Sequence, residues 1–211
     1  MRYLLGSHFW GLNVEGSDQD FMEFSFPTKE ELFAGKFEST QTKTEDGDDL
    51  CLKDYRLLLK ELKKGSLRGF EALYSVGEND GDSPREKELL KFAFDNRDSL
   101  LKELNAELKK SCYGEMLSKF KKAKSKEKNF KALANLHKLH FLVTSKENPF
   151  KTWSNEEALR VRLGEVESYE SSLENFGKLL EDLKGVEFKK EQSKPTLEKF
   201  ESLLLKLVFK F

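Results

Sequence analysis

The spacing of apolar residues changes near residue 54, and this change limits the fold more than any other feature of the chain. Within residues 20–26, apolar and polar side chains alternate, which is the period of a half-buried strand. Beyond residue 54, apolar residues recur at helical spacing almost to the end of the sequence. We therefore expect an α+β fold, with a small α/β core over residues 1–60 and a helical region over residues 61–211.

Turn and cap signals divide the first 60 residues into short elements. Thr28 follows Pro27 and is a candidate helix N-cap, with Glu31 three residues later completing a capping box. Gly35 is suited to end that helix. The predicted strands are residues 1–5, 20–26 and 37–44, and the stretch that follows a polar turn at 45–49 either begins extended or passes directly into a helix.

Composition excludes several classes of protein. The 211 residues carry a formal net charge of -1, so attraction to nucleic acid or to a membrane requires a local patch. No apolar run reaches transmembrane length, and the N-terminus does not resemble a signal peptide. Cys51 and Cys112 are isolated, which predicts free thiols in a reducing compartment. We therefore expect a cytoplasmic protein. Its lysine-rich, proline-poor composition suits a low-GC bacterium or a phage. A phage-encoded protein would act in the host cytoplasm.

Gly6-Ser7 and the acidic box Ser17–Asp20 flank one short loop between two predicted strands. Asp18 and Asp20 are two residues apart, so on an extended chain their carboxylates share a face. Such carboxylates repel unless a cation lies between them, and Mg²⁺ accepts carboxylate oxygens together with substrate phosphates. A glycine lets the backbone approach a phosphate closely. Alone, the acidic box is more typical of an ordinary turn than of a metal site, but the combination predicts a site for a metal and a triphosphate.

The order strand, Gly-Ser, loop, Ser-Asp-x-Asp, strand resembles the DNA polymerase β-like nucleotidyltransferase superfamily. The resemblance is closest to the bacterial and phage nucleotidyltransferases associated with RNA repair, and His8 and Gly11 stand at the matching positions of their motif. Ser66-Leu67 replaces the Asn-Pro of a later family segment. Further matches are diffuse and occur at Glu71, Leu73, Gly114, Leu159, Arg162, Gly164 and Glu165.

This resemblance implies a minimal polymerase β-like mixed sheet with helices, followed by a helical region that packs on the core and completes the active-site cleft. It also implies transfer of a nucleoside monophosphate from a nucleoside triphosphate, with ATP expected first, to a hydroxyl acceptor. Mg²⁺ or Mn²⁺ would be the cofactor. The implied catalytic and metal-binding residues are Asp18, Asp20 and a third carboxylate on a neighbouring strand, for which Asp49 is preferred and Asp48 is the alternative.

The resemblance also implies nucleotide-binding residues from both halves of the chain. They are Gly6, Ser7, His8, Ser17, Lys131, Lys138 and Arg162. In the family's Lys-x-x-x-His-x-x-Arg helix, Asn135 replaces the histidine and Lys138 replaces the arginine. Arg162 has two interpretations, contact with the nucleotide or an ion pair with Glu165. The nearby His137 and His140 are expected to be packing residues.

Residues 109–128 are strongly basic and include two aromatic residues, Tyr113 and Phe120. Lysine clusters can follow the phosphates of RNA, although such a run is also typical of a solvated helix face. We expect an RNA or tRNA end as the acceptor. The alternatives are a protein side-chain hydroxyl, as in adenylylating members of the superfamily, and a catalytically silent protein that binds a nucleotide, RNA or a host protein.

Overall fold

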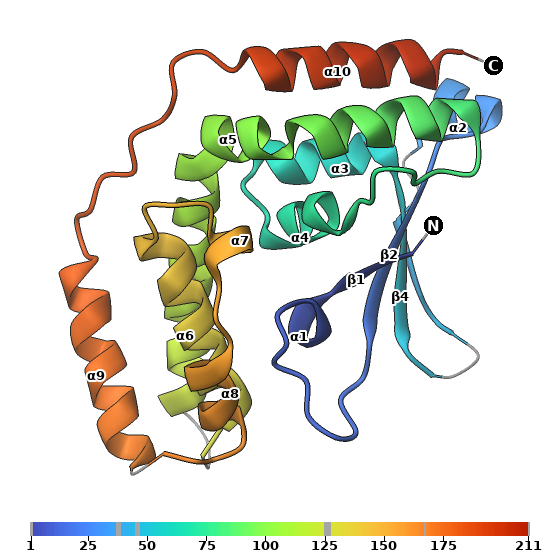
Figure 1. Cartoon of the computed structure of the whole chain (residues 1–211). Helices are drawn as coiled ribbons and strands as arrows, with labels where there is room; N and C mark the ends of the chain where they lie inside the picture. The colour runs from blue at the N-terminus through green and yellow to red at the C-terminus, as the bar shows by residue number, and fades with distance from the viewer. Residues whose placement is uncertain (1, 37–38, 45–46, 125–127, 167, 211) are drawn as a thin grey trace.

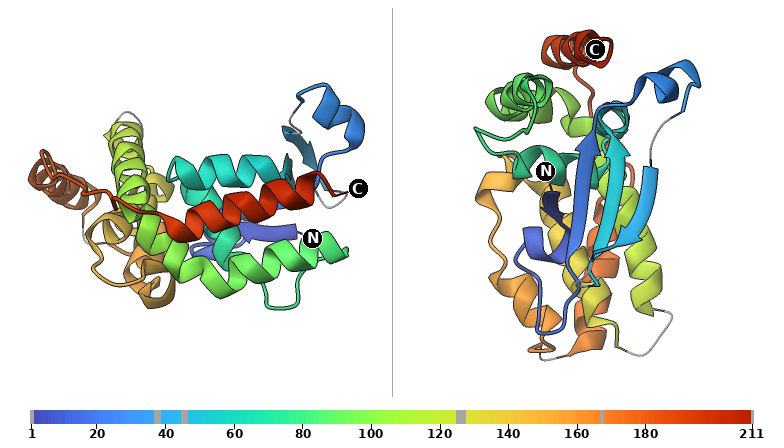
Figure 2. Two further views of the ribbon diagram at one scale, coloured as in Figure 1. Left: turned by 90° about the horizontal axis from the view of Figure 1, so that it is seen from above. Right: turned by 90° about the vertical axis from the view of Figure 1, so that its right-hand side faces the viewer.

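A four-stranded sheet forms one side of the protein, and the helices gather beside it (Figures 1 and 2). The computed structural model describes residues 2–36, 39–44, 47–124, 128–166 and 168–210. No helix within these residues is both long and apolar enough to cross a membrane.

The sheet is mixed, with the strand order β1-β2-β4-β3. Its strands are β1 (Arg2–Leu5), β2 (Asp20–Ser25), β3 (Ser39–Lys43) and β4 (Asp49–Asp54). Strand β2 runs antiparallel to β1 and parallel to β4, whereas β3 runs antiparallel to β4. Leu5 is paired with Asp20, which in turn is paired with Asp49. The end of β1 and the starts of β2 and β4 therefore meet at one edge of the sheet.

Ten helices are found in the described residues. They are α1 (Gly6–Phe9), α2 (Lys29–Phe33), α3 (Tyr55–Lys63), α4 (Leu67–Ser75), α5 (Pro84–Lys124), α6 (Phe130–Thr144), α7 (Pro149–Thr152), α8 (Glu156–Arg162), α9 (Tyr169–Asp182) and α10 (Pro195–Val208). The first part of α5 runs alongside α10, and its last part runs beside α6 (Figure 1). Because α5 reaches both groups of helices, it connects the upper and lower parts of the helical region.

The local signals in the sequence are confirmed at several elements. Met22 and Phe24 of β2 are buried, as the alternation predicts. Thr28 caps α2, and its hydroxyl and the Glu31 side chain form both hydrogen bonds of the capping box. The stretch after residue 48 begins as a strand and becomes helical at Tyr55. The third predicted strand and the polar turn lie partly outside the described residues, at 37–38 and 45–46.

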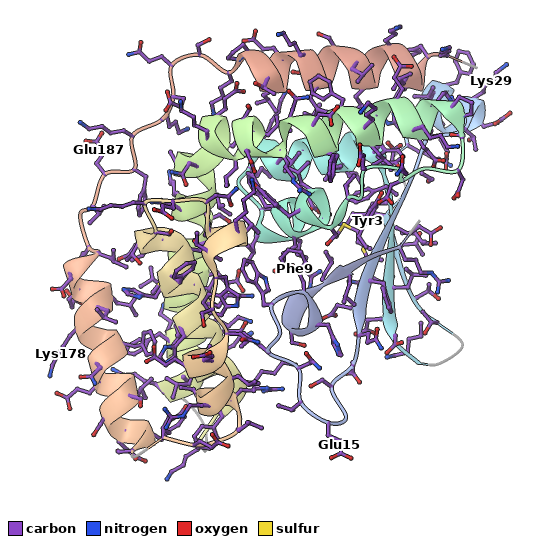
Figure 3. The ribbon with its side chains drawn as sticks, viewed as in Figure 1. Tyr3, Phe9, Glu15, Lys29, Lys178 and Glu187 are labelled. Atoms are coloured by element: carbon purple, nitrogen blue, oxygen red, sulfur yellow. The ribbon has the colours of Figure 1, made fainter. Side chains whose placement is uncertain are left out.

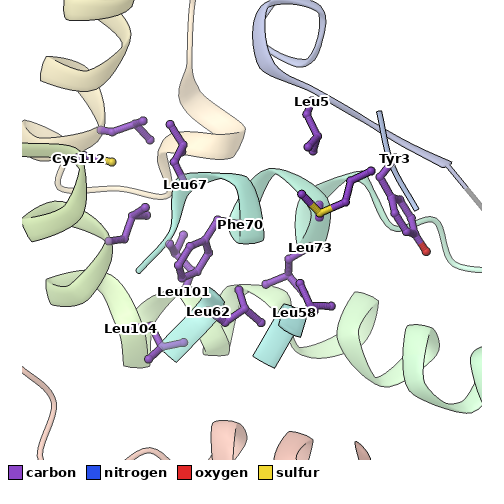
Figure 4. Close-up of a cluster of buried hydrophobic side chains, with 14 of the residues drawn as sticks. Tyr3, Leu5, Leu58, Leu62, Leu67, Phe70, Leu73, Leu101, Leu104 and Cys112 are labelled. Atoms are coloured by element: carbon purple, nitrogen blue, oxygen red, sulfur yellow. The ribbon is translucent and has the colours of Figure 1, made fainter. Parts of the chain in front are cut away.

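The hydrophobic core extends from the sheet and helices α3, α4 and α5 to helices α6, α8, α9 and α10. Side chains fill the spaces between these elements (Figure 3), and Figure 4 shows one cluster of them at close range. Its labelled members come from β1, α3, α4 and α5: Tyr3, Leu5, Leu58, Leu62, Leu67, Phe70, Leu73, Leu101, Leu104 and Cys112. Full burial of such side chains stabilises the fold by about 1.5–3 kcal/mol each. Both cysteines are free thiols, as expected from their isolation.

Gly65 forms the corner between α3 and α4, where the chain touches the backbone of α5. Its φ of +70° lies in the left-handed region, and a Cβ there would lie 2.1 Å from the carbonyl carbon of Glu107. An alanine would therefore be strained and would also clash with atoms that cannot rotate away. This contact fixes α4 against the middle of α5.

Gly65→Ala should destabilise the protein much more than Gly35→Ala, which is its matched control. Gly35 has a similar φ of +63° but open space around it, so its substitution reports backbone strain alone, about 1–2 kcal/mol. We expect Gly65→Ala to lose at least about 2 kcal/mol more, because the clash is added to the strain. Urea unfolding of both variants measures the difference, and equal losses would show that the helical corner does not approach α5 this closely.

Candidate functional site

A cavity of about 590 Å³ opens between the sheet and helices α4, α5, α6 and α8. One wall comes from the first 50 residues and the other from helices far along the chain. Glu15, at the tip of the loop between α1 and β2 (Figure 3), also lines this cavity. The sheet-side wall contains six of the residues expected from the sequence: Gly6, Ser7, Ser17, Asp18, Asp20 and Asp49.

Strand pairing brings two of the three carboxylates of this wall together. Asp20 and Asp49 are register partners on the parallel strands β2 and β4, so their side chains lie on the same face, on strands about 4.8 Å apart. Asp18 precedes Asp20 by two residues. Within the described parts of the chain, the Asp18 and Asp20 carboxylates form no hydrogen bond or ion pair, whereas Asp49 Oδ1 lies 3.0 Å from Lys43 Nζ. The carboxylate oxygens of Asp18 and Asp20 are thus available to a ligand in the cavity, whereas Asp49 already has Lys43 as a partner.

Asp48 has a different role from Asp49. Its Oδ1 accepts a hydrogen bond from the Gln19 N–H at 3.1 Å, and its own N–H donates to Thr44 Oγ1 at 3.0 Å. Asp48 therefore ties the turn before β4 to the segment before β2. Asp49, and not Asp48, lines the cavity.

Gly6 allows the Gly-Ser turn to lie directly against the acidic cluster. Its φ is +62°, and a Cβ at this position would lie 2.6 Å from Asp20 Oδ2. The Gly6 N–H donates to Glu71 Oε2 at 3.3 Å, and Ser7 accepts a hydrogen bond from the Leu12 N–H at 2.7 Å through its carbonyl oxygen. Any side chain at residue 6 would displace the Asp20 carboxylate, so the glycine is required by the close approach.

The opposite wall carries the basic residues expected from the sequence. Lys131 and Lys138 are seven residues apart on α6, which places them on one face of the helix, and Asn135 lies between them. Arg162 comes from the end of α8 and also lines the cavity. Burial lowers the pKa of the Arg162 guanidinium.

The two interpretations of Arg162 can now be separated. Glu165 Oε2 lies 4.0 Å from Arg160 Nε, so the neighbouring arginine makes the ion pair that was considered for Arg162. The Arg162 side chain lines the cavity instead. Its position therefore favours contact with a bound ligand.

His8 is the predicted site residue that the structure does not bring into the cavity wall. Its Nε2 lies 3.3 Å from the carbonyl oxygen of Ser17, so the ring connects α1 to the acidic box.

His137 and His140 pack edge-on against Phe176 of α9, as expected for packing residues. Burial lowers the pKa of both histidines.

Among the lining residues without an individual site role predicted from the sequence, four are charged residues on helices: Arg68, Glu71, Glu115 and Lys119. Arg68 and Glu71 are one helical turn apart on α4, and Glu115 and Lys119 are one turn apart on α5. Glu71 matched a family segment without an assigned role. Helical spacing alone cannot identify these residues, because it does not say which face of α5 meets the sheet.

The carboxylates of the acidic wall could hold a magnesium ion only together with other ligands. Within the described residues, no three His, Cys, Asp or Glu side chains are grouped closely enough to hold a metal ion by themselves. Mg²⁺ is commonly bound by one or two carboxylates, with waters and substrate phosphates completing its octahedron. Asp20 and Asp49 are the neighbouring carboxylates of this wall that could take part in such a site.

The acidic cluster should destabilise the metal-free protein. Like charges opposite each other on paired strands cost about 0.2–1 kcal/mol, so Asp20→Asn should raise the free energy of unfolding by about that amount in EDTA. Asp54→Asn in β4 is the matched control. Asp54 is buried and caps α3, and its carboxylate is paired with Arg56, so its loss should cost about 1–3 kcal/mol. If Asp20→Asn also destabilises the protein, the carboxylates do not repel one another as described.

Comparison with known proteins adds no family assignment. No protein-family model matches the sequence, and no curated protein matches it either. The relation to the polymerase β-like nucleotidyltransferases is therefore a resemblance carried by the residues around Gly6-Ser7 and Asp18–Asp20, together with the diffuse matches beyond them.

Proposed function

We propose that this protein is a metal-dependent nucleotidyltransferase that transfers a nucleoside monophosphate from a nucleoside triphosphate to a hydroxyl acceptor and releases pyrophosphate. One observation carries this proposal. A single cavity has a wall of carboxylates facing a wall of cationic side chains, the first formed by Asp18, Asp20 and Asp49 and the second by Lys131, Lys138 and Arg162.

The distribution of charge suits a metal-bound triphosphate better than either partner alone. A free triphosphate would be repelled by the three carboxylates, and a free cation would be repelled by the lysines and the arginine. A Mg²⁺-triphosphate complex presents a cation to one wall and phosphate oxygens to the other. The Gly6 backbone lies directly against the Asp20 carboxylate, so a phosphate bound through a metal at Asp20 would also come close to this backbone.

The proposed reaction assigns a task to each wall. The acceptor oxygen forms a bond to the α-phosphorus while the bond from that phosphorus to the bridging oxygen of the pyrophosphate breaks. Asp49 would accept the proton of the acceptor hydroxyl, and Lys131 and Lys138 would stabilise the charge that develops on the leaving pyrophosphate. Bound Mg²⁺ would supply further charge stabilisation and would lower the pKa of the acceptor hydroxyl.

The basic segment at residues 109–128 favours an RNA end as the acceptor. Lys119 lines the cavity, and Lys121, Lys122 and Lys124 follow it toward the end of α5. The aromatic residues of this segment, Tyr113 and Phe120, pack against the core, so the contact would be electrostatic and directed to phosphates. Lys109 donates to the Ser145 carbonyl oxygen at 2.8 Å and therefore has a structural partner.

Asp49→Asn should abolish transfer, whereas Asp48→Asn should leave most of it. The assay supplies each α-³²P-labelled nucleoside triphosphate, ATP first, with Mg²⁺, total RNA and cell protein. We expect label in the RNA fraction, a loss of at least about 100-fold in Asp49→Asn, and a loss below about tenfold in Asp48→Asn. Asp48 is the matched control because it neighbours Asp49 in sequence but ties a turn and does not line the cavity.

The other outcomes of this assay are informative. Label in the protein fraction would replace RNA with a side-chain hydroxyl as the acceptor. Nucleotide binding without any label would favour a catalytically silent binding protein. If the folded protein neither binds nor transfers any of the four nucleotides, the proposed function is wrong.

A further inference from the structure

Glu71 of α4 is a carboxylate in the cavity wall that is almost completely buried, with 2% of its surface exposed. Burying a charged carboxylate is costly unless several donors satisfy it. Burial raises the pKa of Glu71, and this effect is opposed first by Lys138 and then by hydrogen bonds from Trp10 and Gly6. The proposed reaction assigns no task to this buried group.

The partners of Glu71 come from both walls of the cavity. Its Oε2 accepts the Gly6 N–H at 3.3 Å, and its Oε1 accepts the Trp10 indole N–H. The same Oε1 lies 3.9 Å from Lys138 Nζ, and the Lys138 ammonium also lies 5.5 Å from the centre of the Trp10 ring. One side chain therefore connects the Gly-Ser turn of α1 to the cationic face of α6.

Lys138 is held in this arrangement by its surroundings. Only 5% of its surface is exposed, so its ammonium has few alternative positions. Both phosphate-facing groups, the Gly6 backbone and the Lys138 ammonium, thus take their position from the same carboxylate.

We propose that Glu71 is a positioning residue that fixes the Gly6-Ser7 turn and the Lys138 ammonium relative to each other, so that both contact one bound polyphosphate chain. The inference rests on the proposed function for the identity of the ligand. Glu71 itself stays behind these groups and acts through them.

Glu71→Gln tests this arrangement with little change in volume. A glutamate offers two acceptor oxygens, whereas a glutamine offers one oxygen and an NH₂ group that only donates. In one orientation of the amide, Gly6 loses its acceptor; in the other, Trp10 and Lys138 lose theirs. Either orientation disconnects one of the two phosphate-facing groups.

The experiment measures binding of inorganic tripolyphosphate with Mg²⁺ to the full chain by calorimetry and by intrinsic fluorescence. Both tryptophans of the chain, Trp10 and Trp153, belong to this network, with ring centres 5.7 Å apart. A polyanion bound at Lys138 would change the electric field at the Trp10 ring and should therefore change the emission. We expect Glu71→Gln to keep its fold by circular dichroism, to bind tripolyphosphate about tenfold more weakly, and to lose the emission change.

Glu115→Gln is the matched control. Glu115 also lines the cavity, but it pairs with Lys119 on its own helix at 3.8 Å and has no link to Gly6 or Lys138. Removing its negative charge should leave the affinity for tripolyphosphate unchanged or raise it. Glu71→Gln removes the same charge, so a loss of affinity in that variant alone identifies positioning and excludes a simple charge effect.

Two results would overturn the inference. In the first, a folded Glu71→Gln variant binds tripolyphosphate as tightly as the protein without the substitution. In the second, the protein without the substitution does not bind tripolyphosphate. If Glu71→Gln fails to fold, Lys138→Met addresses the same link. That variant should lose about tenfold in affinity together with the emission change, and unaltered binding by it would also contradict the inference. Tripolyphosphate carries no nucleoside, so these results stand whether or not nucleotidyl transfer is detected.

Discussion

The parallel pairing of β2 with β4 is the interaction on which the candidate site depends. Its register places Asp20 beside Asp49 and, through β1, brings the Gly-Ser turn to the same edge of the sheet. A slip of one residue would turn these side chains to the opposite face. The burial of Met22 and Phe24 on the core side of β2 prevents that slip, because it would expose them to water. The core therefore sets the geometry of the carboxylates.

The helical region supplies the opposite charge, and its placement depends on a few close contacts. Gly65 sets the corner of α3 and α4 against α5, and α5 in turn packs along α6, which carries Lys131 and Lys138. Glu71 then joins the two walls through Gly6 and Lys138. Opposed charge of this kind is costly to keep without a ligand, because the carboxylates repel one another and the buried ammonium has lost its hydration. A bound metal-triphosphate complex would relieve both costs.

Local signals in the sequence predicted the parts of the structure that depend on near neighbours. The alternation around Met22, the capping box at Thr28 and the onset of helix after Asp54 needed no tertiary information. The resemblance implied a site role for nine of the twenty residues that line the cavity. It preferred Asp49 to Asp48 as the third carboxylate, and the strand register places Asp49 beside Asp20. Apolar spacing predicted a helical region beyond residue 60 but did not give the length of α5, which continues for 41 residues. Glu71, Arg68, Glu115 and Lys119 depend on how distant helices pack, which periodicity does not encode.

The proposed function requires the acidic and the basic wall of the cavity to bind one metal-bound triphosphate together. The most direct test is a crystal structure of the protein with Mn²⁺ and a non-hydrolysable ATP analogue, with the metal located by its anomalous scattering. We expect a Mn²⁺ peak bound by Asp20 and Asp49, with the triphosphate reaching Lys138 and Arg162. A metal or a triphosphate bound elsewhere, with this cavity filled only by solvent, would contradict it.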